Sequence, residues 1–313
     1  MYLDSGDALS YDTLVMATGA RSRRWEGPGI KSDRLFYLRD IGDATRLGLE
    51  LRAGAHIAVI GAGFVGLEVA AAARSLGAEV TVVEVGDRAM PRIVLSEFSA
   101  ALTRCHEEQG VRFYFGTRVV SIKDDVIHLS TGEVLRADTI VVGIGSIPNT
   151  DLAAEAGLAV DDGILVDAFG RTNDPCIYAI GDAARHVNEL LGRRVRLESW
   201  QNAQNGAIAI ARIIAGHVAP YAEMPWFWSE QYDHNLQCAG LPLDIDRIVW
   251  RGDLGRGSAM AFQMSGNTIV GVQALNGGRD MRFGRQLLEA GRSIDLERLS
   301  DPYSSLQEIA RVA

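Results

Sequence analysis

A glycine-rich turn carries the most specific chemistry in the sequence. The run Gly61-Ala62-Gly63-Phe64-Val65-Gly66 fits the pattern GxGxxG and stands between a short apolar segment and an alanine-rich segment. In such a turn the first glycine permits the tight bend, the second lets a diphosphate approach the backbone, and the third lets helix and strand pack closely. A helix N-terminus also offers free amides and partial positive charge to phosphate. The pattern predicts a dinucleotide site; the alternative is a tight turn that binds nothing.

An acidic residue at the end of the next strand indicates which dinucleotide would bind. Glu84 follows Gly61 by 23 positions, where a carboxylate accepts hydrogen bonds from the adenosine ribose hydroxyls and repels a 2′-phosphate. The sequence therefore favours NADH over NADPH. Arg88 and Arg92 lie close enough in sequence to keep NADPH open, unless they are solvated loop residues.

The elements around this turn alternate in type. An apolar run at 56–60, a helical pattern at 64–76 and a β-branched run at 80–83 predict a βαβ unit. Two further apolar runs, 14–17 and 177–180, predict buried parallel strands with neighbours on both sides. Helices are expected at 96–109, 201–215 and 282–290. Further strands are expected at 112–115, 119–123, 126–130 and 139–143, and antiparallel ones at 227–240, 247–251, 259–264 and 269–274.

Composition narrows the class of protein. The 313 residues carry a net charge of −9, which argues against nucleic acid as the main partner. The three cysteines form no paired motif, so neither a disulfide framework nor a metal site is expected, and the predicted location is cytoplasmic. The apolar stretch 55–73 is better explained by a strand, turn and helix than by a membrane span. No signal peptide is visible after Met1.

Several other motifs carry a family resemblance. The segments 14–19 (LVMATG), 144–149 (IGSIPN) and 172–182 (TNDPCIYAIGD) resemble motifs of the glutathione-reductase-like flavoproteins, which have two dinucleotide domains. The segments 225–233 (PWFWSEQYD), 37–39 (YLR) and 198–203 (ESWQNA) are similar to the FAD-dependent ferredoxin reductases of the putidaredoxin, rubredoxin and biphenyl-dioxygenase kind. The His-Glu pair of disulfide reductases is not seen in the last third.

The resemblance implies an α/β fold with two Rossmann-like dinucleotide-binding domains and a C-terminal α+β domain. The expected boundaries are 1–40 with 160–217 for the FAD domain, 41–159 for the NAD domain, and 218–313 for the reductase domain. Family members begin with a βαβ unit that binds the ADP half of FAD, and no such turn precedes Leu14. The FAD domain is therefore expected to be incomplete and N-terminally truncated, and to bind FAD poorly.

The implied activity is electron transfer from NADH through FAD to a ferredoxin-type iron–sulfur protein that serves an oxygenase or a cytochrome P450. Two other possibilities remain. One is another NADH-dependent flavoprotein, such as an NADH oxidase or an apoptosis-inducing-factor-like reductase. The other is an inactive fragment that binds only NADH. No membrane or nucleic-acid partner is expected.

The resemblance also implies roles for single residues. Those assigned to NADH are the residues of the glycine turn, Glu84 and Gly145, with Glu68 placed near the nicotinamide carboxamide. Those assigned to FAD are Thr18, Gly19, Arg39, Asp182 on the ribityl chain, and Ser199 and Trp200 at a helix start facing the flavin. Trp226 is expected to stack near both rings, and Trp228 on the same strand face could assist docking. Several of these residues also have an ordinary structural explanation. Asp182 could cap a helix, and Arg39 could form a salt bridge. Glu68 could compensate the helix dipole, and the tryptophans could pack in the core.

Ferredoxins of this kind are acidic, so the docking surface is expected to be basic. Three arginine clusters are candidates, and the sequence does not choose among them. They are Arg21, Arg23 and Arg24; Arg193, Arg194 and Arg196; and Arg279, Arg282 and Arg285.

Overall fold

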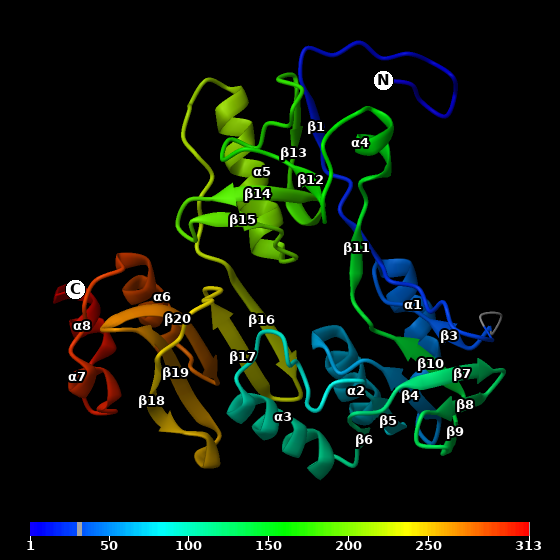
Figure 1. The fold of residues 1–313 in the computed structure, drawn as a ribbon. Helices are drawn as coiled ribbons and strands as arrows, with labels where there is room; N and C mark the ends of the chain where they lie inside the picture. Colours follow the sequence, from blue (N-terminus) through cyan, green and yellow to red (C-terminus); the bar gives the residue numbers. More distant parts are fainter. Residues whose placement is uncertain (30–32, 313) are drawn as a thin grey trace. The chain divides into compact units, whose positions relative to one another are not determined.

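The computed structural model describes residues 1–29 and 33–312, which form two compact units (Figure 1). Unit 1 contains Met1–Arg21 and Ser146–Phe227, and unit 2 contains Ser22–Gly145 and Trp228–Ala313. The fold class expected from the sequence, α/β with a C-terminal antiparallel domain, is confirmed. The division into three domains with the boundaries given above stays a prediction.

A five-stranded parallel sheet organises the first part of unit 2. Its order is β3-β10-β4-β5-β6, and all four neighbouring pairs run parallel. The strands are β3 (Leu35–Phe36), β10 (Thr139–Val142), β4 (His56–Ile60), β5 (Glu79–Val83) and β6 (Arg112–Tyr114). The associated helices are α1 (Ile41–Glu50), α2 (Phe64–Ser75) and α3 (Ser96–Glu108). The predicted βαβ unit is therefore present as β4-α2-β5.

The parallel sheet is covered on both faces. Helix α2 packs on β4 and β5. On the other face lies an antiparallel sheet of β7 (Val119–Lys123), β8 (Val126–Leu129) and β9 (Val134–Arg136). The apolar residues Ile122 and Ile127 of this small sheet form one buried cluster with Ile60 and Ile140 of the large one. Because both faces are buried, the strands read as continuous apolar runs, which is why the sequence locates them well.

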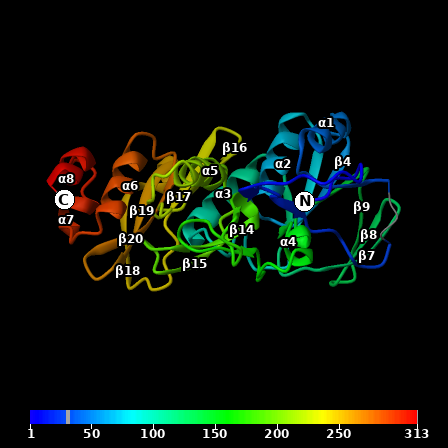
Figure 2. The same ribbon diagram turned by 90° about the horizontal axis from the view of Figure 1, so that it is seen from above.

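The second part of unit 2 is an antiparallel sheet with the order β16-β17-β20-β19-β18. Its strands are β16 (Trp226–Gln231), β17 (His234–Ala239), β20 (Thr268–Leu275), β19 (Ser258–Ser265) and β18 (Arg247–Asp253). Helix α6 (Asp280–Ala290) packs on β20, and α7 (Leu296–Ser300) and α8 (Leu306–Val312) follow (Figure 2). The single strand expected over 227–240 is wrong, because Tyr232, with a φ of 56°, turns the chain between β16 and β17.

Unit 1 contains smaller sheets. Strand β1 (Leu14–Met16) pairs in parallel with β13 (Ile177–Ala179), and among the described residues this sheet has only these two strands. A second sheet joins β12 (Ile164–Leu165), β14 (Ala184–Asn188) and β15 (Arg193–Val195), and β2 (Ala20–Ser22) pairs with β11 (Ser146–Pro148). The helical elements are α4 (Asp151–Glu155), the 3-10 turn η1 (Gly181–Ala183) and α5 (Trp200–Ile214).

The expectation of a fully buried first strand is only half correct. Met16 is buried, whereas Val15 is 38% exposed and Leu14 is partly buried. Strand β1 pairs in parallel, as predicted. In the described residues, however, it has a partner strand on one side only. No helix among them is long and apolar enough to cross a membrane.

Candidate functional site

The first and third glycines of the turn are required by the packing of the chain itself. Gly61 has a φ of +103°, and a Cβ on it would lie 2.4 Å from the carbonyl oxygen of Gly143. A Cβ on Gly66 would lie 2.1 Å from the carbonyl oxygen of Gly61. Any side chain at either position would collide with backbone, so both glycines hold β4, β10 and α2 in close contact.

Gly63 differs from these two, and this difference tests whether a ligand fits. Its φ of −79° and ψ of −176° suit any residue, and a Cβ built on it meets nothing within 4 Å. It is the N-cap of α2, where Ser, Thr, Asp or Asn would normally bond the free amides. Nothing in the described part of the chain requires a glycine there. An approaching diphosphate does, so the residues present fit a dinucleotide.

The remaining members of the turn lie where the pattern places them. Ala62 is buried, Phe64 is partly buried in the first turn of α2, and Val65 is 42% exposed. Gly145, with a φ of +107°, follows β10, the strand beside β4. The glycine turn and Gly145 therefore lie at the carboxyl ends of adjacent parallel strands, which is where open α/β sheets bind ligands.

Glu84 is bonded to the glycine turn. Its Oε2 accepts a hydrogen bond from the Ala62 amide at 2.7 Å, and its Oε1 accepts one from the Gly86 amide at 2.7 Å. The carboxylate is half-buried directly after β5. The structure thus places a negative charge on the side of the turn predicted for the adenosine ribose.

The two loop arginines lie in different surroundings. Arg88 donates to the carbonyl oxygens of Val94 at 2.9 Å and Pro91 at 3.0 Å, so it braces its own loop. One Nη of Arg92 lies 3.9 Å from where a Cβ on Gly145 would be. Gly145 follows β10 and Glu84 follows β5, and β4 separates these strands. Arg92 therefore lies near the end of β10, whereas the ribose is expected near the end of β5. This separation weakens the case for NADPH.

The loop that carries these arginines is held from two directions. The amide of Met90, a residue with a φ of 49°, donates to the Ala62 carbonyl at 3.0 Å. Buried Gln273 of β20 donates to the Ile93 carbonyl at 2.7 Å and accepts from the Leu95 amide at 2.9 Å. The antiparallel sheet thereby fixes a loop that borders the glycine turn. Sequence reasoning missed Gln273, and no motif marks it.

Glu68 lies on the second turn of α2 and faces β16. Ser229 Oγ donates to its Oε1 at 2.6 Å. Burial raises the pKa of Glu68, and the hydrogen bond from Ser229 opposes that rise. Glu68 is therefore a partly buried carboxylate with a specific partner, whereas a glutamate that only compensates the helix dipole would need none.

In unit 1 the residues around Thr18 are held by reciprocal bonds. Thr18 Oγ1 donates to the Asn149 carbonyl at 2.6 Å, and Asn149 Nδ2 donates to the Thr18 carbonyl at 2.8 Å. Gly19 has a φ of 65° and accepts from the Asn149 amide at 2.9 Å. Asn149 belongs to the motif segment 144–149, but no sequence signal indicates its hydrogen bonds with Thr18.

Asp182 and the start of α5 also belong to unit 1. Asp182 is partly buried in η1, directly after β13. Ser199 is the N-cap of α5, and its Oγ accepts from the Asn202 amide at 3.2 Å. Trp200 begins the helix and is 67% exposed, so ordinary core packing does not explain it. Thr18, Gly19, Asp182, Ser199 and Trp200 thus share one unit.

Arg39 and Trp226 complete the predicted residues. Arg39 is exposed in unit 2, directly before the Asp40 cap of α1, and its amide donates to Asp43 Oδ2 at 3.1 Å. Trp226 is partly buried at the first position of β16, within unit 1. The roles of both toward FAD stay predictions.

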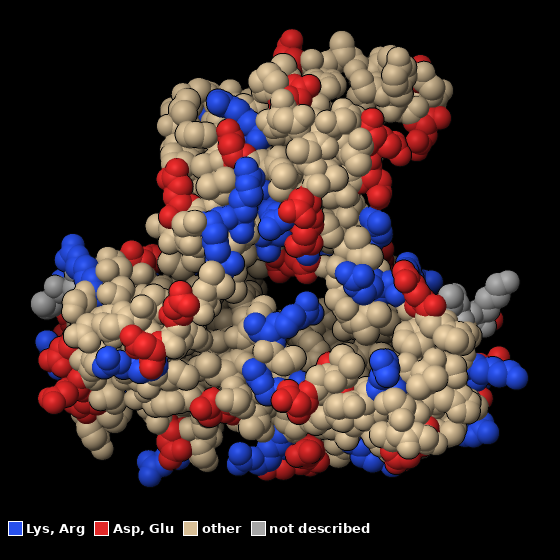
Figure 3. Space-filling model, in the orientation of Figure 1, with Lys and Arg blue, Asp and Glu red and all other residues tan. Residues whose placement is uncertain are grey.

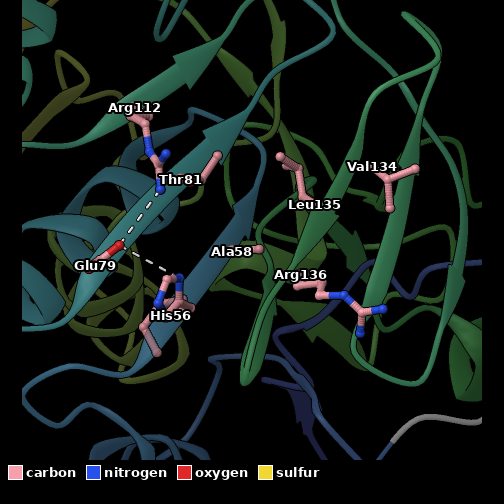
Figure 4. A pocket seen from close by; sticks show the side chains of 9 residues that line it. His56, Ala58, Glu79, Thr81, Arg112, Val134, Leu135 and Arg136 are labelled. Carbon is pink, nitrogen blue, oxygen red and sulfur yellow. Dashed lines mark ion pairs between the residues drawn. The ribbon is translucent and has the colours of Figure 1, made fainter.

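A hollow of about 340 Å³ in unit 2 is not the dinucleotide site (Figure 4). His56 and Glu79, 3.6 Å apart, open β4 and β5, and Arg112 lies 3.7 Å from Glu79. These residues stand at the amino ends of the strands, whereas the glycine turn follows their carboxyl ends. Arg136 on the β9 side is paired with Asp125 at 2.7 Å.

Comparison with known proteins decides the family. A family model described as pyridine nucleotide-disulphide oxidoreductase matches residues 2–207, and one described as reductase C-terminal matches 226–310. The chain belongs to the pyridine nucleotide-disulphide oxidoreductase family. The second match agrees with the likeness seen in segment 225–233, so the resemblance to ferredoxin reductases is confirmed.

Among members of this family, the ferredoxin–NAD(+) reductase component of the anthranilate 1,2-dioxygenase system of Burkholderia cepacia is 43% identical, covering 97% of this chain and 76% of that protein. The ferredoxin reductase for the CYP199A2 system from Rhodopseudomonas palustris has a TM-score of 0.95 at 39% identity, covering 98% and 77% of the two chains. Putidaredoxin reductase in its covalent complex with putidaredoxin has a TM-score of 0.95 at 36% identity, covering 100% and 77%.

Proposed function

We propose that this protein is an NADH-dependent FAD oxidoreductase that passes electrons to a ferredoxin-type iron–sulfur protein, serving an oxygenase or a cytochrome P450. The observation that carries the proposal is the glycine turn of unit 2, where Gly63 faces open space at the start of α2. The reductase type of C-terminal domain supports a ferredoxin as acceptor, as do relatives named for that activity.

The NADH site follows from the groups around the turn. The amides at the start of α2 would hold the diphosphate, and Gly63 would leave room for it. Glu84 would accept from the adenosine ribose hydroxyls, and its charge would disfavour a 2′-phosphate. Gly145 would let the nicotinamide half lie close to the end of β10, and the Glu68 carboxylate would accept from the carboxamide.

The FAD site is assigned to unit 1, and the role of Arg39 toward FAD stays a prediction from the sequence. Asp182 would accept from the ribityl hydroxyls. The first amides of α5, which Ser199 starts, would face the flavin and favour negative charge on it. Thr18 and Gly19 would border the cofactor after β1, and Trp226 would cover the rings.

FAD, when bound, would supply the redox chemistry, namely hydride acceptance and single-electron release. The protein binds and orients the two cofactors and excludes water. Its described residues include no group of three or more His, Cys, Asp or Glu able to hold a metal ion. A cytoplasmic location stays a prediction.

The test is a visible absorption spectrum of the purified chain with added FAD, before and after anaerobic NADH. The proposal requires that any flavin band retained by the chain bleaches with NADH, and less readily with NADPH. A flavin band that NADH leaves unchanged would contradict the proposal. If no flavin is retained while NADH still binds, the chain acts only as an NADH-binding protein.

An acceptor series separates the related activities. An NADH oxidase would reduce oxygen rapidly, whereas a ferredoxin reductase would reduce an acidic iron–sulfur protein much faster than oxygen. Equal or faster oxygen consumption would favour the oxidase alternative.

A further inference from the structure

A line of polar side chains connects α2, β16 and α3 inside unit 2. Ser229 Oγ donates to Glu68 Oε1 at 2.6 Å and accepts from Gln231 Nε2 at 3.1 Å. Gln231 Oε1 lies 2.9 Å from Nε2 of His106. Nδ1 of His106 lies 3.2 Å from the hydroxyl of Tyr232. These five residues are called the polar chain below.

The hydrogen bonds of the polar chain point in one direction. Gln231 uses its amide nitrogen on Ser229, so its oxygen must accept from His106. Nε2 of His106 therefore carries the proton, and Nδ1 accepts from the Tyr232 hydroxyl. Burial lowers the pKa of His106, which keeps the ring neutral and compatible with this arrangement. Each donor thus points toward the next member, and the last acceptor is the Glu68 carboxylate.

Structural stability alone does not account for so many connected polar groups. The exposed fraction is 1% for Ser229, 1% for Gln231 and 0% for His106. Buried polar groups contribute little net stability compared with apolar groups of the same shape. The inward positions of β16 carry Ser229 and Gln231, while Glu230 between them is exposed. The polar chain ends at Glu68, two residues after Gly66 of the dinucleotide turn.

We propose that Ser229, Gln231 and His106 are positioning residues that hold the Glu68 carboxylate ionised and oriented toward the carboxamide of bound NADH. This inference rests on the proposed function, because it requires a nicotinamide beside Glu68. It assigns to the antiparallel domain a direct part in the NADH site, through the inward residues of β16.

The charges around the polar chain determine the pH dependence. Burial raises the pKa of Glu68, the Ser229 bond lowers it, the Glu230 carboxylate on β16 raises it, and a hydrogen bond from the Glu230 backbone amide lowers it. At the other end His234 lies near His106, and Arg74 and Cys105 lie near Tyr232. Removing the Ser229 hydroxyl removes the larger of the two lowering influences, so the pKa of Glu68 rises further and its ionised form appears only at higher pH. Tight NADH binding should then also begin at higher pH.

The experiment measures the Kd for NADH by nucleotide fluorescence, and the rate of anaerobic flavin reduction, from about pH 5 to 9. For Ser229→Ala we expect the Kd at neutral pH to rise about five-fold, as for one lost hydrogen bond, and the pH profile to move upward. Ser229→Thr keeps a hydroxyl and should restore both. Ser75→Ala is the matched control, since Ser75 lies on the same helix and bonds only the Ala71 carbonyl.

A positioning role makes the effects non-additive. In a Glu68→Gln background, Ser229→Ala should cause no further loss, because the hydroxyl acts through the carboxylate. Equal losses in both backgrounds, or an unchanged pH profile in folded Ser229→Ala, would overturn the proposal. If Ser229→Ala does not fold, Tyr232→Phe decides, since it removes the outermost donor without changing shape, and an unmoved profile refutes the role. Absence of NADH binding in the unaltered chain would instead refute the proposed function.

Discussion

The parallel sheet of unit 2 and the parallel pair in unit 1 differ in how completely they are enclosed. In β4, Ile57, Ala58 and Val59 are at most 1% exposed, because α2 packs on one face of the sheet and β7–β9 cover the other. In β1, Val15 is 38% exposed, and β13 is its only described partner. Parallel strands are stabilised mainly by neighbouring strands and by packing that covers both faces of the sheet. The parallel sheet of unit 2 should therefore be far more stable locally than the parallel pair of unit 1.

The largest expected effect is in hydrogen exchange. Amides of β4 and β10 should exchange at least about a hundred-fold more slowly than those of β1 and β13, since local opening follows burial and pairing. Exchange followed by mass spectrometry on the chain without cofactors measures this directly. Similar protection of the amides in both regions would contradict the difference described here. Added FAD should slow amide exchange in β1 if it binds there.

Within the enclosed region, Gly61→Ala tests how tightly the turn is packed. The substitution meets both a φ of +103° and a carbonyl oxygen 2.4 Å from the new Cβ. We expect a loss of stability of about 3 kcal/mol or more, seen as a lower Tm by circular dichroism. Gly48→Ala in α1 is the control, because its Cβ meets nothing and a helix interior favours alanine. An unchanged Tm in Gly61→Ala would show that the turn is looser than described.

Gly63→Ala separates the needs of the ligand from those of the protein. Its Cβ meets no atom within 4 Å, so the Tm should hardly change. The methyl group would enter the space assigned to the diphosphate, and the Kd for NADH should rise about ten-fold, or about 1.4 kcal/mol. Titration calorimetry on both variants gives the comparison. Unaltered NADH binding in Gly63→Ala would place the diphosphate elsewhere.

These two glycines also show what the sequence could and could not predict. The pattern located the turn and strands such as β4, because an apolar run bounded by glycines is a local signal. It did not reveal that Gln273 holds the loop at Ile93, since the two residues are 180 positions apart. For the same reason the bond between His106 and Gln231 could not be read from either segment. Local chemistry is visible in sequence, whereas partnerships between distant elements depend on the fold.

A smaller effect is expected at Glu84, which accepts hydrogen bonds from the Ala62 amide of the turn and from the Gly86 amide of its own loop. Glu84→Gln keeps the shape, but it weakens the acceptor for the ribose and removes the charge that opposes a 2′-phosphate. The preference for NADH over NADPH should fall about five-fold, mostly through the two KM values. The matched control is Glu79→Gln at the opposite end of the same strand, where the preference should not change. A preference unchanged in Glu84→Gln would mean that discrimination lies elsewhere.

The smallest expected effect concerns ferredoxin docking, where the two units again differ. In unit 1 the arginines over β14 and β15 are mixed with acids (Figure 3), since Arg196 bonds Asp162 and Glu198. In unit 2, Arg279 and Arg282 are exposed and form no salt bridge with the described residues. Uncompensated charge attracts an acidic partner more strongly.

Turnover with ferredoxin should therefore fall several-fold between about 50 and 500 mM salt. Arg282→Glu should reduce the salt response more than Arg193→Glu does. A flat response in the unaltered protein would exclude electrostatic docking, and a larger effect of Arg193→Glu would move the docking surface to unit 1.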